Sequence, residues 1–471
     1  MSNELEYKDL DLPTFVGSRE AMRIEGYDKN GEKKLIAVPF YDVPKAAVLA
    51  GVSFLNIGDT RCGKSQLMRD IHKCYFGGSA DNGGKSNWNV ARNDFSSDAY
   101  FTTIDQTKVG EGKGMLYESK VPVVERVKAL CNIVDEINLA IPEVQVEFFG
   151  MAEGEHRGVR LGEDGYHLFM ASCNLNRVNG DFAGTSQINR ALLNRFGVTF
   201  DFDYFRKTDD DEEVLAQRTG REQAEVRDIS GKIIEAYQKI SEASRKREPW
   251  LEAYIRMFSS GLDYCAEDSD GLKKKMWPSR CGGCSRQGKD ICSLVKQSNT
   301  GTSQLLKRFA NAVNFIIGLK HPGISLDPFD LALESFKFTT YHGNLNGVET
   351  LSTYSGEDQE QMRDVVSKIR EKIEPIRSYI DTAIQSAVYD GKAEDRFIEI
   401  QQGGDKEVRV YSEDQKRNLD VLKGKKDFSY KVVSPFDKSF GEKKGIRIDW
   451  LKGYIDSLSK YYKKNPVKNE S

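Results

Sequence analysis

Eight consecutive residues match the pattern Gly-x-x-x-x-Gly-Lys-Ser/Thr, namely Gly58, Asp59, Thr60, Arg61, Cys62, Gly63, Lys64 and Ser65. In such a loop, successive backbone N–H groups and the positive end of a helix dipole face a polyphosphate anion. Lys64 would reach the β- and γ-phosphates, and the Ser65 hydroxyl would bind Mg²⁺. The loop therefore predicts a nucleotide site, and the alternative is a tight turn that uses only the two glycines.

The elements that must position this loop are also predicted. The apolar run 52–57 indicates a buried strand before it, and residues 65–76 indicate a helix after it. Upstream, residues 34–38 favour a strand and residues 42–51 a helix. Residues 77–97 are rich in turn formers and are predicted to be a surface loop.

Two adjacent carboxylates, Asp135 and Glu136, follow the apolar stretch 130–134. This is the Walker B pattern, in which Asp135 would hold Mg²⁺ through water and Glu136 would polarise the attacking water. The interval after Ser65 leaves room for an intervening βα unit. Paired acids also occur at helix N-termini, where they favour the dipole, and this is the alternative.

Asn174 ends another apolar strand, predicted over 168–172 after a hairpin that turns at 162–165. In a parallel sheet this strand end lies next to the ends of the two strands described above. The Asn174 amide is therefore a candidate to orient water near the γ-phosphate. A turn-forming asparagine at a strand end is the alternative.

Arg190 and Arg195 lie in a predicted helix at 188–196, before an apolar strand at 198–202. Each is a candidate to reach a neighbouring subunit, where an arginine supplied in trans stabilises charge on the transferred phosphoryl group. Two solvated or ion-paired helix arginines are the alternative.

In this order the motifs resemble those of an AAA+ ATPase, and within that class the MoxR-like and dynein-related group. The resemblance covers about residues 40–220 and includes Val134-Asp-Glu-Ile-Asn-Leu-Ala140, Ala191-Leu-Leu-Asn-Arg-Phe196 and the acidic stretch 210–215. It departs from the group at Leu139, where an arginine is usual, and after Asn174, where a proline is usual. Both departures leave the subfamily and its partner open.

The resemblance implies an α/β fold, the P-loop αβα sandwich, with ATP and Mg²⁺ as cofactors. It implies that Asn174 is the sensor 1 residue and Arg195 the arginine finger. A finger in trans implies a ring of identical subunits, expected to be a hexamer. The implied client is a protein or another macromolecule, remodelled in a chaperone-like way.

Helices predicted at 226–245, 250–257 and 303–317 resemble the helical lid of this class, and Arg308 is the nearest candidate for its phosphate-sensing arginine. A cysteine-rich insert interrupts the lid with Cys265, Cys281, Cys284 and Cys292. Four thiolates with one Cys-x-x-C pair suit a single tetrahedral ion, so a structural Zn²⁺ is predicted. An iron–sulfur cluster, which uses the same ligands, is one alternative to zinc, and four free thiols are another. Cys62, Cys74, Cys131 and Cys173 are dispersed and are predicted to be small buried side chains.

The C-terminal third predicts a helical apolar stripe at 362–387 broken at Pro375, a hairpin at 397–411 and a final helix at 449–462. The basic, aromatic tail 460–468 could contact nucleic acid or an acidic partner, or be solvated.

The predicted domains are an N-terminal segment (1–38), an AAA+ core (39–205), a lid with its insert at 265–292 (206–340) and a C-terminal region (341–471).

Composition limits the partners. Lysine and arginine total 69 against 72 aspartates and glutamates, a net charge of −3, which predicts no general attraction to nucleic acid.

No apolar run approaches the ~18 residues of a membrane span. The polar, acidic start at Met1 is unlike a secretory signal, so a cytoplasmic location without membrane contact is expected.

Three functions are compatible with these motifs. The first is an ATP-hydrolysing ring protein that remodels a client. The second is a nucleic-acid-associated motor or restriction- or defence-type NTPase subunit, which could use GTP. The third is a nucleotide-gated scaffold without hydrolysis, which the complete catalytic set disfavours. The sequence does not distinguish ATP from GTP and does not identify the client.

Overall fold

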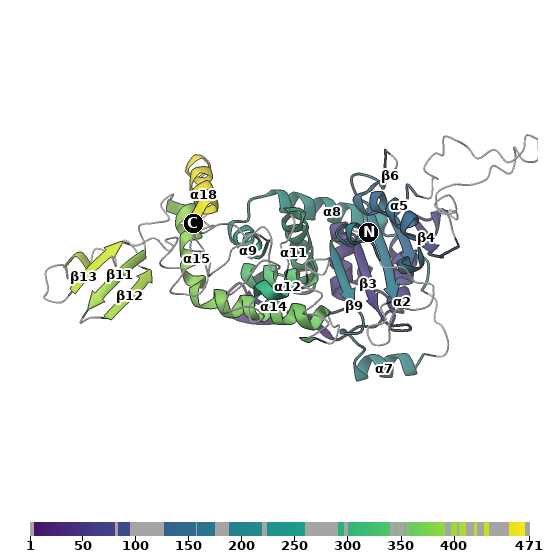
Figure 1. The fold of residues 1–471 in the computed structure, drawn as a ribbon, viewed down its shortest axis with the longest axis horizontal. Helices are drawn as coiled ribbons and strands as arrows, with labels where there is room; N and C mark the ends of the chain where they lie inside the picture. Colours follow the sequence, from purple (N-terminus) through teal and green to yellow (C-terminus); the bar gives the residue numbers. More distant parts are fainter. Residues whose placement is uncertain are drawn as a thin grey trace, which may run out of the picture. The chain divides into compact units, whose positions relative to one another are not determined.

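The computed structural model describes residues 4–80, 83–94, 127–156, 158–174, 188–218, 224–259, 291–295, 300–339, 345, 353–354, 358–390, 397–402, 405–410, 419–421, 428–432 and 452–466. The chain divides into two compact units. The first comprises Met1–Lys246 and Gln304–Met362, and the second comprises Arg247–Ser303 and Arg363–Ser471. Figure 1 labels many of the elements of both units.

The first unit contains a five-stranded parallel sheet with the strand order β4-β5-β8-β3-β9. Its strands are β3 (Phe54–Gly58), β4 (Ser86–Val90), β5 (Cys131–Asp135), β8 (Leu168–Asn174) and β9 (Val198–Asp201). Every residue of β3, β5 and β9 is buried, which explains why these strands are nearly continuous apolar runs in the sequence. The register places Gly58 beside Asn174, so the start of the phosphate loop and the end of β8 lie at the same edge.

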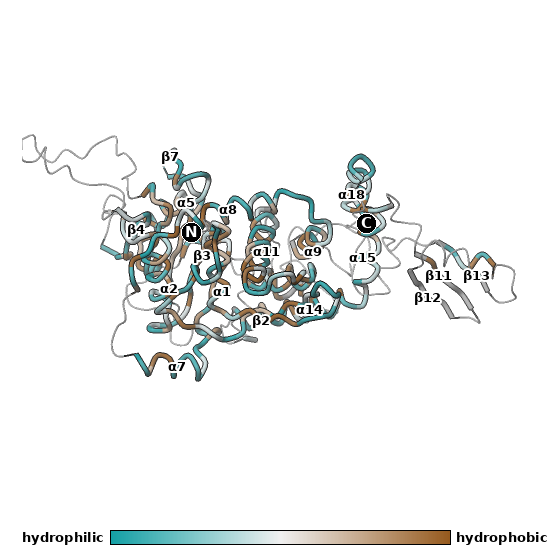
Figure 2. Tube along the Cα trace, turned by 180° about the vertical axis from the view of Figure 1, so that it is seen from behind, coloured by the Kyte–Doolittle hydropathy of each residue, from teal (hydrophilic) through white to brown (hydrophobic). Residues whose placement is uncertain are grey.

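The first unit also contains helices. They are α1 (Asp42–Ala50), α2 (Lys64–Asp70), α5 (Pro142–Glu153), α6 (Arg190–Leu193), α7 (Asp209–Ala216), α8 (Ser230–Arg245), α11 (Thr300–Lys320) and α12 (Pro328–Thr339), with the short turns η1 (Tyr7–Leu10), η2 (Ile71–Tyr75) and η4 (Ile137–Leu139). Of these helices, α2, α5 and α12 contact the parallel sheet. Helix α2 packs against β3 and β8, α5 packs against β8, and α1 packs against α8. In Figure 2 the trace around β3 is coloured hydrophobic, as expected for a strand buried between these layers.

An aromatic cluster fixes the chain that follows β9. Phe40 stacks on Phe205 with ring centroids 4.7 Å apart and meets Phe202 edge-on at 5.3 Å. Phe338 of α12 stacks on Phe205 at 5.7 Å. Such ring pairs stabilise a core beyond their buried area. The cluster thereby holds residues 202–205 beside the phosphate loop.

A second, antiparallel sheet joins the N-terminal residues to the chain after α11. It has the order β10-β1-β2 and comprises β1 (Glu20–Tyr27), β2 (Lys33–Pro39) and β10 (Ser325–Leu326). Helix α12 packs against β1. The predicted domain borders at 38/39, 205/206 and 340/341 do not coincide with the borders of the compact units, and they stay predictions.

The second unit consists of helices and a three-stranded antiparallel sheet with the order β12-β11-β13. Its helices are α9 (Pro249–Ser259), α10 (Ile291–Leu294), α14 (Asp358–Ile373), η6 (Glu374–Ile376), α15 (Arg377–Gln385), η7 (Ser386–Asp390) and α18 (Lys452–Lys464), and its sheet comprises β11 (Phe397–Gln402), β12 (Asp405–Val410) and β13 (Phe428–Val432). The Tyr254 hydroxyl donates to Asp381 at 2.6 Å, which links α9 to α15. The Tyr454 hydroxyl donates to Glu252 at 3.0 Å, which links α18 to α9.

Most of the predicted elements are present. The break at Pro375 and the hairpin of β11 and β12 are confirmed. The helix after the phosphate loop runs through α2 into the π-helical turn η2.

Other predictions need correction. Residues 77–97 are not all loop, because Ser86–Val90 form β4 at the sheet edge, where Asn87 donates to Asn132 at 3.1 Å. Its polar sequence hid this strand, since an edge strand is only partly covered. The helix predicted at 188–196 is limited to Arg190–Leu193. By contrast, the turn predicted at 162–165 is confirmed, because Glu163 and Tyr166 exchange backbone hydrogen bonds in an antiparallel bridge. A further hairpin lies before it, between β6 (Glu155–His156) and β7 (Val159–Arg160).

No helix among the described residues is long and apolar enough to span a membrane.

Candidate active site

The phosphate loop connects β3 to α2 through backbone that requires glycine. Gly58 has φ 145° and Gly63 has φ 109°, values that other residues rarely adopt. A Cβ atom on Gly58 would also lie 3.2 Å from Asp203 Oδ1 and from Cys62 Sγ. The predicted strand–loop–helix context is therefore confirmed, and both glycines are explained by the turn.

Lys64 lies inside the curve of this loop. Its side chain is buried, and its ammonium donates to the carbonyl oxygens of Gly58 at 2.8 Å and Asp59 at 2.6 Å. The ammonium is also 3.4 Å from Cys62 Sγ. Burial raises the pKa of the Cys62 thiol, and the Lys64 charge opposes that rise. The Asp59 N–H donates to the Asp203 carboxylate at 2.9 Å, so the chain after β9 holds the loop.

The predicted acidic residues meet Ser65 at the edge of the sheet. Ser65 Oγ donates to Asp135 Oδ1 at 3.1 Å. Ser172 Oγ donates to the same carboxylate oxygen and accepts the Glu136 N–H at 2.9 Å. Glu136 has left-handed backbone (φ 56°, ψ 46°), and this hydrogen bond supports that conformation.

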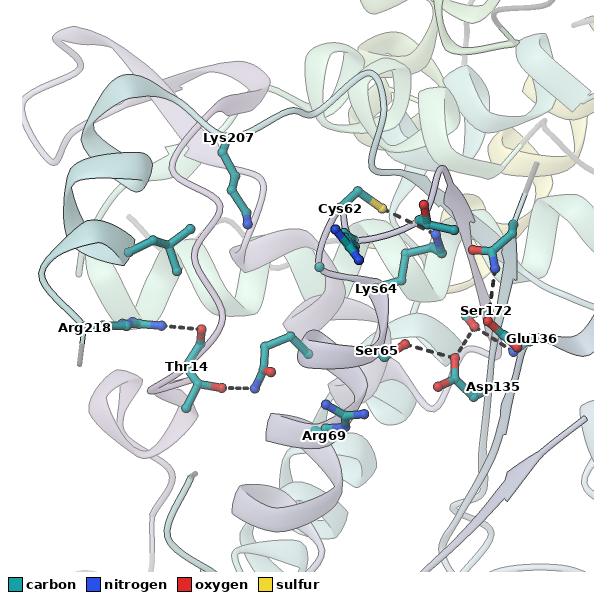
Figure 3. Close-up of a pocket in the computed structure, with 16 residues that line it drawn as sticks. Thr14, Cys62, Lys64, Ser65, Arg69, Asp135, Glu136, Ser172, Lys207 and Arg218 are labelled. Atoms are coloured by element: carbon teal, nitrogen blue, oxygen red, sulfur yellow. Dashed lines mark hydrogen bonds between the residues drawn. The ribbon is translucent and has the colours of Figure 1, made fainter. Parts of the chain in front are cut away.

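Asn174 completes this group. Its Nδ2 donates to Glu136 Oε1 at 3.1 Å, and its own carbonyl accepts from Asn138 Nδ2 at 3.2 Å. Strand β8 lies between β3 and β5 in the sheet, which places Asn174 between the phosphate loop and Asp135. The structure thus brings together Lys64, Ser65, Asp135, Glu136 and Asn174, as Figure 3 shows for most of them.

These residues open onto a cavity of about 400 Å³, a size usual for small-molecule sites. Its lining consists of Thr14, Thr60, Arg61, Cys62, Gly63, Lys64, Ser65, Gln66, Arg69, Asp135, Glu136, Ser172, Asn174, Lys207, Leu215 and Arg218. The Ser65 hydroxyl and Asp135 carboxylate are oxygen ligands of the kind that Mg²⁺ prefers. Their 3.1 Å separation fits a shared cation, so the residues fit the predicted metal.

Several lining residues are not predicted from the sequence. Ser172 lies two positions before Asn174 on β8, and strand alternation could have identified it as a neighbour on the same face. Thr14, Lys207 and Arg218 have no motif. Thr14 is placed by Asp70, a fully buried carboxylate that accepts the Thr14 N–H at 2.8 Å.

Of the three arginines singled out from the sequence, Arg195 and Arg308 do not line this cavity, and the side chain of Arg190 lies outside the described residues. Arg195 Nε donates to Glu153 Oε1 at 2.7 Å, its Nη1 donates to Ala191 O at 2.9 Å, and its guanidinium lies 4.6 Å from the Phe149 ring. Arg308 is also engaged elsewhere, as its Nη2 donates to Gly51 O at 3.3 Å. Burial lowers the pKa of the Arg308 guanidinium.

The predicted zinc site is not tested by the structure. Cys265, Cys281 and Cys284 lie outside the described residues, as does the side chain of Cys292. Among the residues that are described, no cluster of three or more His, Cys, Asp or Glu side chains could hold a metal ion. Cys74, Cys131 and Cys173 are free and buried, as predicted, whereas Cys62 is half-buried.

No family model matches the sequence, and no curated protein matches it. Among solved structures, the fold is similar to a protein of Cytophaga hutchinsonii provisionally named an ATPase, with 17% identity over 69% of this chain and 86% of that chain and a TM-score of 0.48. A full-length MCM homologue of Methanopyrus kandleri has 9% identity over 64% of this chain and 55% of that chain, with a TM-score of 0.35. Likeness at this level supports no inference about activity, which is argued below from the site.

Proposed function

We propose that this chain is an AAA+ nucleoside triphosphatase that hydrolyses ATP. The observation that carries the proposal is the convergence of Ser65, Asp135, Glu136 and Asn174 on one cavity beside Lys64. A phosphate loop alone would support only binding. An acidic pair held by hydrogen bonds at the same edge adds a base for water and oxygen ligands for a cation.

Each residue has a role in this reaction. Glu136 takes a proton from the attacking water, and Asn174 holds the Glu136 carboxylate in place through their 3.1 Å hydrogen bond. Lys64 moves from the loop carbonyls to the phosphate oxygens and neutralises their charge. Mg²⁺, when held by Ser65 and Asp135, would neutralise the charge that develops on the phosphoryl group.

The assembly is the second part of the proposal. Arg195 does not line the cavity of its own chain, so any contact with transferred phosphate would have to occur in a neighbouring chain. We therefore infer a ring, a hexamer by resemblance to AAA+ proteins, in which Arg195 serves the adjacent site. By the same resemblance, the work done is remodelling of a protein or macromolecular client, and a structural Zn²⁺ at the four cysteines and a cytoplasmic location complete the proposal.

Glu136→Gln tests the reaction. The amide keeps the size of the side chain but cannot accept a proton, so hydrolysis should fall by about 10²–10⁴-fold, the contribution typical of a general base. Binding of ATP should persist, because Glu136 is not part of the phosphate loop. The measurements are phosphate release and equilibrium binding of a fluorescent ATP analogue.

Glu143→Gln is the matched control, since Glu143 is exposed at the start of α5 and does not line the cavity. Hydrolysis at the wild-type rate by the Glu136 variant would refute the catalytic assignment. Absence of nucleotide binding by the wild-type chain would refute the whole proposal.

A further inference from the structure

The cavity has a cationic wall that no sequence motif predicts. Lys207 and Arg218 line it, one residue just before α7 and the other just after it. In Figure 3 they lie on the opposite side of the phosphate loop from Asp135 and Glu136. A cationic side chain that lines the cavity therefore flanks each end of helix α7.

The Arg218 guanidinium binds backbone carbonyls of its own chain. Its Nη1 donates to Thr14 O at 2.6 Å, and its Nη2 donates to Pro13 O at 3.1 Å. Thr14 is bound in turn to Asp70 of α2. Arg218 is thus a clamp between the end of α7 and the N-terminal chain, and it positions this wall.

Lys207 differs from Arg218 because its ammonium has no hydrogen-bond or ion-pair partner among the residues that the structure describes. It is half-buried, and Figure 3 shows its side chain directed toward the cavity. Neighbouring contacts fix its backbone: Arg206 Nε donates to Asp203 O at 2.8 Å, and the Thr208 N–H donates to Asp211 at 3.0 Å.

This segment is also tied to the phosphate loop, because the Asp203 carboxylate accepts the Asp59 N–H. The backbone at Lys207 is therefore fixed relative to the phosphate loop, which contains Lys64, while the Lys207 ammonium stays without a partner among the described residues. Lys64 and Arg61 line the same cavity, and their positive charges repel the Lys207 ammonium. An anion that enters the cavity would remove this repulsion and give the ammonium a charge-assisted hydrogen bond.

We propose that Lys207 binds the phosphate chain of a nucleotide held by the phosphate loop of the same chain. The proposal rests on the proposed function, because it requires a polyphosphate in this cavity. It also makes Lys207, two residues before α7, the residue that contacts the phosphates from within the same chain. Arg308, which the sequence suggests for this role, is engaged with Gly51 O. Phosphate binding would then act on both ends of α7, through Lys207 before the helix and through the Arg218 clamp after it.

Lys207→Ala and Lys207→Arg test this assignment. Dissociation constants are measured for ATPγS and for inorganic tripolyphosphate, both with Mg²⁺, in the full-length chain. Loss of one charged contact should weaken both ligands by about tenfold, and arginine should recover most of that loss. The charge-matched control is Lys29→Ala, in the exposed turn between β1 and β2, which should leave both constants unchanged.

The outcomes separate the two proposals. Failure of the wild-type chain to bind either ligand refutes the proposed function and this inference with it. Wild-type binding that Lys207→Ala leaves unaltered refutes only the inference. Weaker ATPγS binding with unaltered tripolyphosphate binding also refutes it, since Lys207 would then contact the nucleoside. Thermal unfolding of each variant shows whether the fold is retained, and an unfolded alanine variant leaves the decision to Lys207→Gln.

Discussion

The two walls of the cavity are built in different ways. The acidic wall uses the ends of two adjacent strands, where Asp135, Glu136 and Asn174 lie within hydrogen-bond distance of Ser172 or of each other. The cationic wall joins the N-terminal chain at Thr14 to the two ends of α7, segments about 200 residues apart in the sequence. Sheet register sets the first wall, whereas separate side-chain clamps set the second.

This difference predicts different consequences of mutation. On the acidic wall, the strands stay buried and paired when one functional side chain is altered, so the chemistry should change while the fold persists. On the cationic wall, the side chains that hold the segments together also hold the fold. Substitutions of these connecting side chains should change stability and nucleotide affinity together, whereas substitution of Lys207, which connects no described segments, should change affinity alone.

Asp135→Asn should have the largest effect and should confirm the first half of this comparison. The amide has the same shape but no charge to offer a cation, and the Ser65 and Ser172 hydroxyls would lose an ionised acceptor. Hydrolysis should fall at least about 100-fold, the scale for loss of one preorganised electrostatic contact. Phosphate release at saturating Mg²⁺ measures it, with an unfolding curve as control. A large loss of stability would show instead that Asp135 holds the sheet together.

Asp70→Asn should have its effect on the other wall and should appear first as lost stability. The buried Asp70 carboxylate accepts the N–H groups of Thr14 and Phe15, each at 2.8 Å, as well as the Thr14 hydroxyl. An amide offers one acceptor oxygen in place of two, so one or more buried donors would be left without a partner. The free energy of unfolding should fall by about 1–3 kcal/mol.

Chemical denaturation measures this change, and nucleotide affinity should weaken in parallel. Asp94→Asn is a control, because Asp94 is exposed and its ion-pair partner is the nearby Arg92, at 2.9 Å. Unchanged stability in the Asp70 variant would mean that the N-terminal chain does not depend on this anchor.

The comparison also explains how far the sequence could predict the site. Lys64 was identified from the phosphate-loop pattern, and Asp135 and Asn174 from their place at the end of an apolar strand. The phosphate loop also follows such a strand, and strands of a parallel sheet end at one edge. This rule alone predicts that the three residues lie near one another in the fold. Ser172 was missed although strand alternation places it on the same face as Asn174, because a single serine within an apolar run does not by itself form a known motif.

Lys207 and Arg218 could not be found in this way. Their place depends on how α7 sits against residues 13–18, for example through Asp211, which accepts the Ser18 N–H at 3.1 Å. Contacts between segments so far apart leave no local pattern. The edge strand β4 was missed for a related reason, since its polar residues are satisfied by neighbours such as Asn132 that only the fold brings near.

Ser172→Ala should have an intermediate effect and should sharpen the account of the acidic wall. Removing the hydroxyl takes a hydrogen-bond donor from Asp135 and an acceptor from the Glu136 N–H. Loss of about one such contact from the transition state corresponds to roughly a tenfold slower hydrolysis. Single-turnover rates measure it, and Ser172→Thr, which keeps the hydroxyl, is the control. If alanine and threonine slow the reaction equally, volume at this position matters rather than the hydroxyl.

Glu153→Gln should have the smallest effect, because Glu153 belongs to neither wall. Its ion pair with Arg195 is exposed, and such pairs contribute about 0–1 kcal/mol, so the unfolding curve should barely move. The Phe149 ring and the Ala191 carbonyl would still hold the Arg195 guanidinium. If Arg195 acts in a neighbouring chain, its ion pair with Glu153 competes with that contact. The variant should then hydrolyse ATP at most about threefold faster at subsaturating chain concentration, which is equivalent to less than about 1 kcal/mol. A rate that is independent of chain concentration in both proteins would argue that the site is complete without a neighbour, and the two walls would then contain all of the catalytic groups.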